Sequence, residues 1–477
     1  MSLTLSANSR SFKEWQITRP LTMDLYFFNW TNPEDIYDPN IKPRFVEVGP
    51  YRLSHIREKV NITWNDHNDT ITYKQLLSYY LDENSPGNLS DVITTIDMVA
   101  LSLAQRTKDT IFLVKDPAKV ALLFSDIYMR KTAKELISGF KHTLVSAANA
   151  LNFITGEQAP DKFGFFYSNN QTVGFDGVFN VKTKAGSDFG TLQNWNYNNV
   201  TSMYEGECGD VKGSAGEFYP QHLTPDSITY FSADLCRSLE FTFEKTETVN
   251  GILSYKYSAM DAVFDNGSII EKNKCYCTER CFPSGVIDNS PCRNGVPIFS
   301  SLPHFYYADE SYINKIEGMN PQKDKHEFYF TFEPRVGVIT STAARLQLNV
   351  LLEPLPDYQL YKNVPELMFP IFWTEHKVEL YEEHVANIKL LLMSPTINKV
   401  FSIVLIIIGV IPKGMHDYDK CIKASDAERI IGSKSTLRRL MTKLLVPLHQ
   451  MGSGRKGEQD KLEGFTEDEF FEMHLIV

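Results

Sequence analysis

Six of the seven cysteines lie close together in the sequence and are the residues best placed for covalent chemistry. They fall within residues 208–292, whereas the seventh, Cys421, stands alone near the C-terminus. An even cysteine set in an oxidising compartment typically forms disulfides, whose pairing the sequence alone leaves open. The alternative is zinc, but Cys275, Cys277 and Cys281 lack the paired C-x2-C or H-x3-H spacing of common zinc fingers. We therefore expect no metal, and disulfides among Cys208, Cys236, Cys275, Cys277, Cys281 and Cys292.

Sequons for asparagine-linked glycosylation agree with that compartment. One N-x-[ST] triplet is weak evidence of a glycan, because such triplets also occur by chance. Here they accumulate in the N-terminal part of the chain, which favours a glycosylated lumenal or extracellular domain. The alternative is that some lie in buried strands and are never modified. The predicted glycosylation sites are Asn29, Asn61, Asn68, Asn88, Asn170, Asn199 and Asn266.

The sequence carries no motif of a common enzyme class. It lacks G-x-S-x-G, H-E-x-x-H and G-x4-G-K-[ST]. His55, His304 and His326 stand beside or near aromatic residues, and we interpret them as structural histidines. A hydrolase that assembles its catalytic residues from distant segments stays open as an alternative, because triads are recognised by geometry. We expect no catalysis and no cofactor.

Composition sets further limits. The 477 residues include 43% hydrophobic and 12% aromatic side chains, enough for a large buried core. The formal net charge is -11. Nucleic-acid binders gain affinity by neutralising phosphates with Lys and Arg, so this acidic balance argues against a nucleic-acid partner.

The elements that would position these residues are mainly strands. Aromatic and β-branched runs separated by turn signals occur at 25–30, 44–53, 60–64 and 70–73, and they return between 163 and 373. Between them, residues 94–150 have a helical pattern. Asp116-Pro117 resembles a helix start, and Thr132 with Glu135 forms a capping box. The fold class is therefore α+β, a large antiparallel β domain with a helical insertion.

A mostly apolar segment covers residues 390–411 and is followed by a charged stretch. A membrane-spanning helix needs about 20 mostly apolar residues, so we expect a C-terminal transmembrane helix there. Lysines directly after it mark the cytoplasmic side, which makes 412–477 a cytoplasmic tail, partly disordered. The first 16 residues have no apolar stretch of a signal peptide. A glycosylated domain must be translocated, so we expect that an upstream anchor is missing from this chain.

Nine short motifs follow one another along the chain: FFNWTNPE (27–34), VGPY (48–51), KELISGF (134–140), GxFYP (216–220), FSADLCRS (231–238), CYCTE (275–279), SLPHFYYA (301–308), NPx4H (320–326) and RLQLNVL (345–351). Together they resemble the CD36 family of scavenger receptors and lysosomal integral membrane proteins, and among them the croquemort-like insect members. The likeness runs from about residue 9 to 411.

The resemblance implies an ectodomain over residues 1–389, built as a β-barrel with an internal lipid tunnel and a helical apical cap at 94–150. It implies the pairs Cys208 to Cys275, Cys236 to Cys292, and Cys277 to Cys281. It also implies lipid partners (fatty acids, sterols and phospholipids) carried by lipoproteins or by apoptotic or bacterial surfaces. The implied location is the plasma membrane, with the lysosomal membrane as the alternative.

Ligand capture would fall to the cap, where basic side chains outnumber acidic ones over residues 105–142. A local positive surface on an acidic protein attracts anionic particles. The predicted ligand-binding residues of the cap are Arg130, Lys131, Lys134 and Lys119. The apolar run Val120, Leu122, Leu123 and Phe124 is either core or an exposed landing surface, and we favour core.

The function we expect is a scavenger-receptor-like glycoprotein that binds particles and transfers lipid. The alternatives are a lysosomal receptor that escorts a soluble hydrolase, and a lumenal lipid hydrolase.

Overall fold

The protein is described by a computed structural model that covers residues 4–7, 9–150, 160–277, 280–293 and 295–422. Side chains at 10, 147–150, 395, 396 and 405–422 lie outside the description. The described residues form two compact units, which divide between Leu380 and Tyr381.

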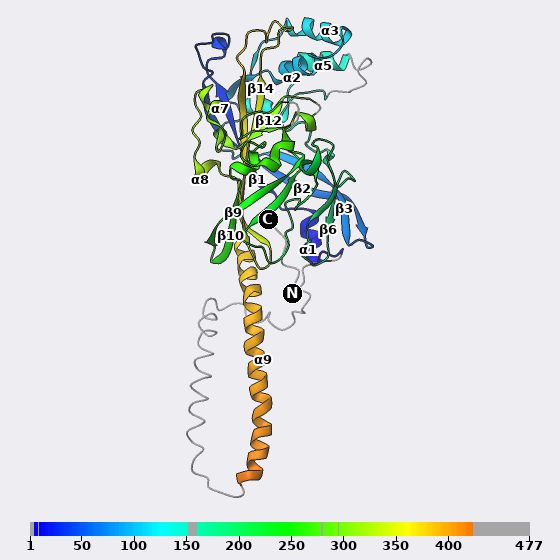
Figure 1. The fold of residues 1–477 in the computed structure, drawn as a ribbon, viewed down its shortest axis with the longest axis vertical. Coiled ribbons are helices and arrows are strands. Elements are labelled where there is room, and N and C mark those ends of the chain that lie inside the picture. Colours follow the sequence, from blue (N-terminus) through cyan, green and yellow to red (C-terminus); the bar gives the residue numbers. More distant parts are fainter. Residues whose placement is uncertain (1–3, 8, 151–159, 278–279, 294, 423–477) are drawn as a thin grey trace. The chain divides into compact units, whose positions relative to one another are not determined.

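The first unit is built on one large antiparallel sheet (Figure 1). Its strands follow the order β7-β6-β3-β2-β1-β15-β14-β13-β10-β9-β8, with β12 added to β14 and β11 to β12. The strand bounds are β1 Leu21–Trp30, β2 Phe45–Asn65, β3 Thr70–Leu81, β6 Val173–Lys182, β7 Leu192–Trp195, β8 Ser227–Ser232, β9 Arg237–Val249, β10 Ile252–Ser258, β11 Ile287–Asp288, β12 Ile298–Ser301, β13 Tyr329–Glu333, β14 Val338–Leu352 and β15 Leu367–Glu379.

A short segment closes the sheet into a barrel. The carbonyl of Gly213 accepts a hydrogen bond from the N–H of Leu192 on β7, 2.7 Å away. The next residue, Ser214, bonds to Thr229 and Phe231 on β8 at 2.9 and 2.8 Å. Strands β7 and β8, at the two ends of the strand order, are therefore connected through Gly213 and Ser214. Gly213 has φ +87, and a Cβ there would lie 2.3 Å from the carbonyl oxygen of Thr229, so the closure requires glycine.

The predicted β domain is confirmed, with one difference in its first strands. The predicted strands 44–53 and 60–64 form one continuous strand, β2, which also runs through the Gly49-Pro50 pair. The ladder between β1 and β2 shifts register between Leu25 and Phe27, opposite this pair. A bulge of this kind absorbs the irregular backbone without ending the strand.

The helical insertion lies at one end of the barrel (Figure 1). It contains a two-stranded sheet, β4 Val92–Ile96 and β5 Tyr128–Thr132, and four helices, α2 Met98–Thr107, α3 Phe112–Leu122, α4 Ala133–Ser138 and α5 Thr143–Ala150. The capping box of α4 forms as predicted, because Thr132 and Glu135 each accept a hydrogen bond from the other's backbone N–H. Helix α3, however, begins at Phe112, four residues before the expected start at Asp116-Pro117. The shorter helices of the barrel wall are α1 Arg10–Gln16, α7 Glu310–Asn314 and α8 Lys323–His326.

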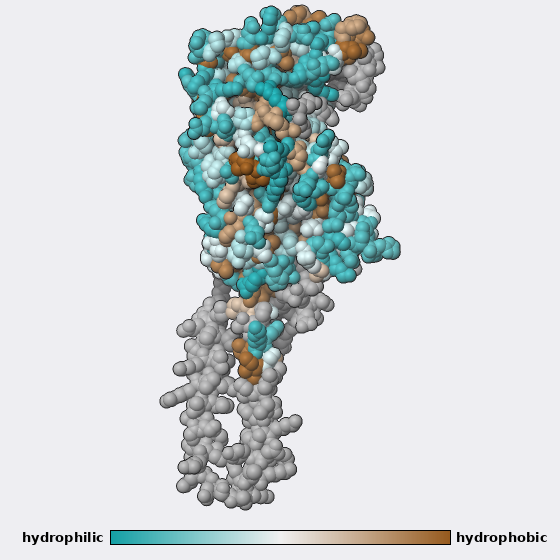
Figure 2. All heavy atoms as spheres, in the orientation of Figure 1, coloured by the Kyte–Doolittle hydropathy of each residue, from teal (hydrophilic) through white to brown (hydrophobic). Residues whose placement is uncertain are grey.

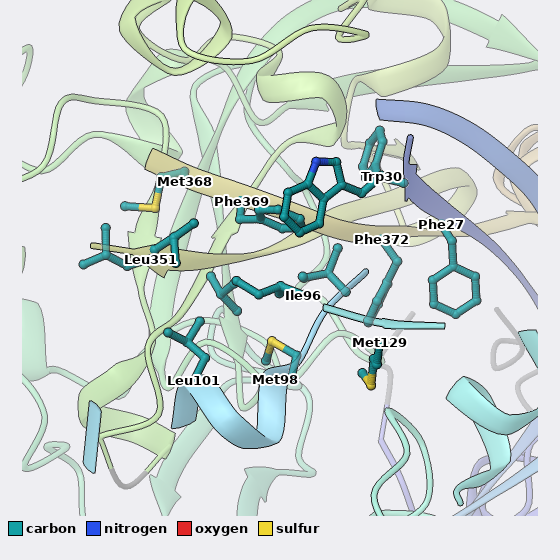
Figure 3. Packing of buried hydrophobic residues seen from close by; sticks show 14 of the residues in the cluster. Phe27, Trp30, Ile96, Met98, Leu101, Met129, Leu351, Met368, Phe369 and Phe372 are labelled. Carbon is teal, nitrogen blue, oxygen red and sulfur yellow. The ribbon is translucent and has the colours of Figure 1, made fainter. Parts of the chain in front are cut away.

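The cap and the upper barrel share one hydrophobic core (Figure 3). Ile96, Met98 and Leu101 of the cap pack with side chains from β1, β14 and β15. Two further buried clusters lie lower in the barrel, one around Phe241 and Phe330 and the other around Trp15 and Phe179. The cap is therefore packed onto the barrel, and the barrel interior holds separate clusters.

The second unit contains one described element, α9 Glu382–Ile422, which includes the predicted membrane segment 390–411. In the part of the chain that the structure describes, no helix is both long enough and apolar enough to cross a membrane. The predicted span lies partly outside the described side chains, and the tail beyond residue 422 lies entirely outside the described residues.

Candidate functional site

Three disulfides fix the loops beside the barrel. The structure joins Cys208 to Cys275, Cys236 to Cys292, and Cys277 to Cys281, which is the pairing that the resemblance implied. All six sulfurs are used, so none is left to bind zinc. The side chain of Cys421 lies outside the described residues.

The sequons differ in how freely their amides reach solvent. Asn29, Asn170 and Asn266 are half-buried, and each uses its side-chain amide in a hydrogen bond, to Thr94, Tyr79 and Phe282 respectively. A glycan on the amide nitrogen of Asn170 or Asn266 would displace the bond that this nitrogen donates. The exposed sequons are Asn61, Asn68, Asn88 and Asn199.

Two histidines and a carboxylate meet on the outer face of the barrel. Glu47, His304 and His326 offer ligand atoms that lie within 4.8 Å of one another, a spacing that would suit a metal ion. Glu47 already accepts hydrogen bonds from His304 Nε2 and from Trp373 Nε1, both at 2.7 Å. The two imidazole rings stack with centroids 4.4 Å apart.

The protonation pattern argues against a metal here. His304 Nδ1 accepts a hydrogen bond from the N–H of Asn320 at 3.1 Å, and His326 Nδ1 accepts one from Gln322 at 2.9 Å. The proton of each neutral ring must therefore be on Nε2, the nitrogen that would have to bind the metal. Metal-binding histidines normally donate through their second nitrogen instead. The geometry fits structural histidines that hold a loop against the barrel, as the sequence suggested.

Helix α3 of the cap presents apolar side chains to solvent. The interpretation of its C-terminal run as core is wrong for Val120, Leu123 and Phe124, and Phe124 is 87% exposed. Helix α3 buries only a narrow stripe, Ala118 and Leu122, one turn apart. Figure 2 shows hydrophobic atoms gathered at this end of the molecule. We call this surface the α3 apolar patch; its members are Ile111, Phe112, Leu113, Val120, Leu123 and Phe124.

The basic residues predicted to capture ligands are less free than their number suggests. Arg130 forms an ion pair with Glu34 at 3.1 Å, and Lys119 lies 3.8 Å from Asp357. Lys131 Nζ lies over the ring of Phe140, 4.5 Å from its centroid. Lys134 is exposed. A pocket of about 360 Å³ opens next to the patch, lined by Tyr37, Lys119, Leu122, Leu123 and Leu360 among others.

The central strand β14 keeps accessible surface on the face that points into the barrel. Its residues alternate, because Arg345 and Gln347 are buried whereas Leu346 between them is half-buried. The buried pair is covered from outside by the loop that carries α8. Arg345 donates to the carbonyl of Glu327 at 2.8 Å, and Gln347 accepts from the N–H of His304 at 2.6 Å. The accessible area of Leu346 therefore lies on the inner face.

The same inner face continues over the neighbouring strands. Thr374 of β15 pairs with Leu346, and the ring of His376 lies 4.7 Å from that of His55 on β2, which pairs with Tyr79 of β3. His376 and Tyr79 are half-buried, yet burial lowers the pKa of His376 to about 3 and raises the pKa of Tyr79 to about 12. Burial disfavours the charged forms of both side chains, so this face of the sheet is poorly solvated.

Comparison with known proteins decides the family. A family model described as the CD36 family matches residues 1–413. The chain belongs to the CD36 family. Protein peste of Drosophila melanogaster is 36% identical over 86% of this chain and 75% of its own length. Lysosome membrane protein 2 of Mus musculus is 30% identical, over 81% and 80%. Scavenger receptor class B member 1 of Rattus norvegicus is 29% identical, over 78% and 74%.

Membership of the CD36 family confirms the resemblance that the motifs indicated. The names of these relatives agree with the predicted location at the plasma membrane or the lysosomal membrane. They describe receptors and membrane proteins, which is in keeping with the expectation of a receptor. The sequence offered an exposed surface at Val120, Leu123 and Phe124 only as the alternative to core, and it did not indicate the polar residues of the inner face. Both depend on which neighbours cover a side chain.

Proposed function

We propose that this CD36 family member is a scavenger-receptor-like membrane glycoprotein. It docks lipid-bearing particles on the α3 apolar patch and passes lipid into the space inside its barrel, without catalysis. The observation that carries the proposal is the exposure of six large apolar side chains on one short stretch of the cap. Contiguous exposed apolar surface of this kind marks a binding site for proteins or lipids.

The patch is suited to a lipid surface because its side chains lose contact with water on docking. Full burial of a Phe or Leu side chain contributes about 1.5–3 kcal/mol. If Leu123 and Phe124 each bury half of their area, the pair contributes roughly 1.5–3 kcal/mol. Such a gain is large compared with the contribution of an exposed ion pair, about 0–1 kcal/mol.

Charge has a supporting role in this proposal. Lys131 and Lys134 would attract anionic lipid before contact. Arg130 and Lys119 would bind an anionic lipid only after they release their carboxylate partners, Glu34 and Asp357. The ligands we propose are fatty acids, sterols and phospholipids in lipoproteins or on apoptotic or bacterial surfaces. Because the patch is apolar and exposed, we expect lipid binding to depend strongly on apolar contact and only weakly on the charge of the lipid.

The second step that we propose is transfer of lipid through the interior of the barrel. Leu346 and Leu348 of β14 keep accessible area on the inner face of the barrel. An acyl chain in contact with such side chains is shielded from water, at about 0.8 kcal/mol per CH2. Lipid that moves through this space would avoid full rehydration. We propose it as the lipid tunnel.

The proposed membrane arrangement has three parts. Residues 1–389 form the ectodomain, 390–411 the transmembrane helix and 412–477 the cytoplasmic tail. Glycans are proposed at the exposed sequons Asn61, Asn68, Asn88 and Asn199. Treatment of the expressed protein with a glycosidase, before and after Asn-to-Gln changes at these positions, tests the arrangement.

Docking is tested with the double variant Leu123→Ser, Phe124→Ser. We expect binding of the full chain to phosphatidylcholine vesicles to fall by about 10- to 150-fold, in line with the free energy above. The matched control is Leu253→Ser, because Leu253 is 56% exposed on the distant β9–β10 hairpin. Equal loss in both variants, or no loss in the double variant, would contradict the patch.

Transfer is tested by narrowing the inner space. Leu346→Trp should slow the uptake of a fluorescent phospholipid from bound vesicles while leaving vesicle binding unchanged. Lys377→Trp, at an exposed position on β15, controls for the added ring. Uptake that is equally fast in all three proteins would refute transfer through the barrel and leave docking intact.

A lysosomal receptor that escorts a soluble hydrolase is the second candidate. Similarity to lysosome membrane protein 2 favours a lysosomal location, and the same patch would then meet a protein surface. Retention of a soluble hydrolase by the wild-type chain, lost in the Leu123→Ser, Phe124→Ser variant, together with absent vesicle binding, would favour this candidate over the first.

A further inference from the structure

Two stacked histidines bind a loop to the outer face of the barrel. His304 lies in the 3-10 helix η6 Pro303–Phe305, and His326 is the last residue of α8 (Figure 1). The two residues are 5% and 3% exposed, and their ring centroids lie 4.4 Å apart. Both rings are therefore enclosed between the loop and the barrel wall.

Each ring accepts a hydrogen bond from the backbone of the loop. His304 Nδ1 accepts from the N–H of Asn320 at 3.1 Å, and His326 Nδ1 accepts from the N–H of Gln322 at 2.9 Å. An imidazole nitrogen can accept only while it carries no proton. The neutral forms of the two rings thus hold residues 320–322 in place.

The barrel wall holds the histidine pair in turn. Glu47 on β2 accepts from His304 Nε2 at 2.7 Å, and Gln347 on β14 accepts from the backbone N–H of His304 at 2.6 Å. Arg345 on β14 donates to the carbonyl of Glu327, the residue after His326, at 2.8 Å. The two imidazoles therefore connect residues 320–322 to the wall.

The backbone around His304 is in an unfavourable conformation. His304, Phe305 and Tyr307 have φ of +55, +57 and +57, in the left-handed region that residues with a Cβ rarely adopt. Such conformations persist only where the surrounding contacts enforce them. The attached state of the loop thus depends on the contacts that His304 makes.

Charged groups from the neighbouring elements act on the pair in opposite directions. The carboxylate of Glu47 favours a proton on His326, whereas Arg345 and Lys325 oppose one. The groups that face the two rings are Glu47 of β2, Arg345 of β14, Lys325 of α8, and the aromatic rings of Phe28 on β1 and Trp373 on β15.

The attached loop disfavours protonation of His326. Burial, and next the charge of His304, lower the pKa of His326 from 6.5 to about 4. Once residues 320–322 leave the ring, water reaches it and the pKa returns toward 6.5. Attachment of the loop and protonation of the ring therefore oppose each other.

We propose that His304 and His326 form an acid-sensitive latch, which releases residues 320–322 from the barrel wall when the rings take up protons at Nδ1. Each new Nδ1–H points at a backbone N–H, so neither accepted hydrogen bond can persist. Two positive rings 4.4 Å apart also repel each other. This inference does not depend on lipid docking or transfer. It gives the loop one state at neutral pH and another in an acidic compartment.

The direction of the change follows from proton linkage. Between pH 6.5 and about 4 the released state holds a proton on His326 that the attached state lacks. Release therefore becomes more favourable as the pH falls through this window. These two pKa values shift the equilibrium toward release by roughly 25-fold between pH 7.4 and pH 5.

Hydrogen exchange of the full chain, read by mass spectrometry at pH 7.4 and pH 5, measures the release. After correction for the intrinsic effect of pH on exchange, protection of the Gln322 amide should fall roughly 25-fold in the wild type. Protection of the Asn320 amide should fall with it. Helix α4, which contains no histidine, should keep its protection at both pH values.

Asparagine variants isolate the proton. His326→Asn keeps an acceptor oxygen near the position of Nδ1 but cannot take up a proton, so protection of Gln322 should no longer depend on pH. His304→Asn should have the same effect on Asn320, and it tests the latch if His326→Asn does not fold. The matched control is His67→Asn, at an exposed position between β2 and β3, which should behave like the wild type.

Three results would overturn the latch. The first is equal protection of Gln322 and Asn320 at pH 7.4 and pH 5 in the wild type. The second is a loss at pH 5 that survives in both His326→Asn and His304→Asn. The third is a loss of protection on addition of EDTA at pH 7.4, because a metal ion would then hold the loop. Protection that EDTA leaves unchanged supports the latch.

Discussion

Replacement of Asp176 by Asn should stabilise the protein at alkaline pH and have little effect at acid pH. Asp176 is half-buried on β6, and its Oδ1 has no hydrogen-bond partner among the described residues. Burial, followed by repulsion from Asp234, raises the pKa of the carboxyl from 3.8 to about 7 in the folded protein. Asparagine has nearly the same shape and cannot ionise.

The direction follows from proton linkage. Between pH 3.8 and about 7 the folded state holds a proton on Asp176 that the unfolded state has released. The free energy of unfolding of the wild type must therefore fall as the pH rises through this window. A shift of about three pKa units corresponds to roughly 4 kcal/mol, and partial access to solvent reduces this to roughly 2 kcal/mol.

Urea denaturation of the wild type and of Asp176→Asn at pH 4.5 and pH 8 measures the effect. We expect the variant to be more stable by roughly 2 kcal/mol at pH 8 and by much less at pH 4.5. Asp226→Asn, at an exposed position, controls for the chemical change. The reasoning fails if the stability difference between Asp176→Asn and the wild type is the same at both pH values.

Three further predictions concern the stability of the barrel and the cap. Glu217→Gln should destabilise the protein by about 3–5 kcal/mol in urea titrations, because it leaves the fully buried Lys59 without its counter-charge. The double variant Glu217→Gln, Lys59→Met should recover most of this loss. If the double variant recovers none of it, the ion pair is not the cause. Gly213→Ala should lower the melting temperature more than Gly206→Ala. Both glycines have positive φ, but only at Gly213 does the backbone lie within contact distance of a new Cβ. Equal effects would show that the close approach of Gly213 to Thr229 is unimportant for stability. Thr132→Ala should cost about 1 kcal/mol of stability in urea through loss of the α4 cap, whereas Thr132→Ser should be nearly neutral, and a neutral Ala variant would contradict the capping box.

Strand positions were accessible to prediction because their signal is local. The alternation of Leu346, Leu348 and Val350 predicts one shared face, and the structure places them on one strand, β14. The capping box at Thr132 was found for the same reason, since its two partners are three residues apart.

The functional surfaces were harder to predict because they depend on distant neighbours. Val120 and Phe124 have the composition of core residues, and only the narrow contact of Ala118 and Leu122 with the cap leaves them exposed. The start of α3 was misplaced because Asp116-Pro117 looks like a helix start. Pro117 instead lies inside α3, where its missing N–H removes one backbone hydrogen bond of the helix.

The inner face combines residues that are hundreds of positions apart in the sequence. Arg57, Asp176 and His376 lie on β2, β6 and β15, and nothing local to any of them signals the other two.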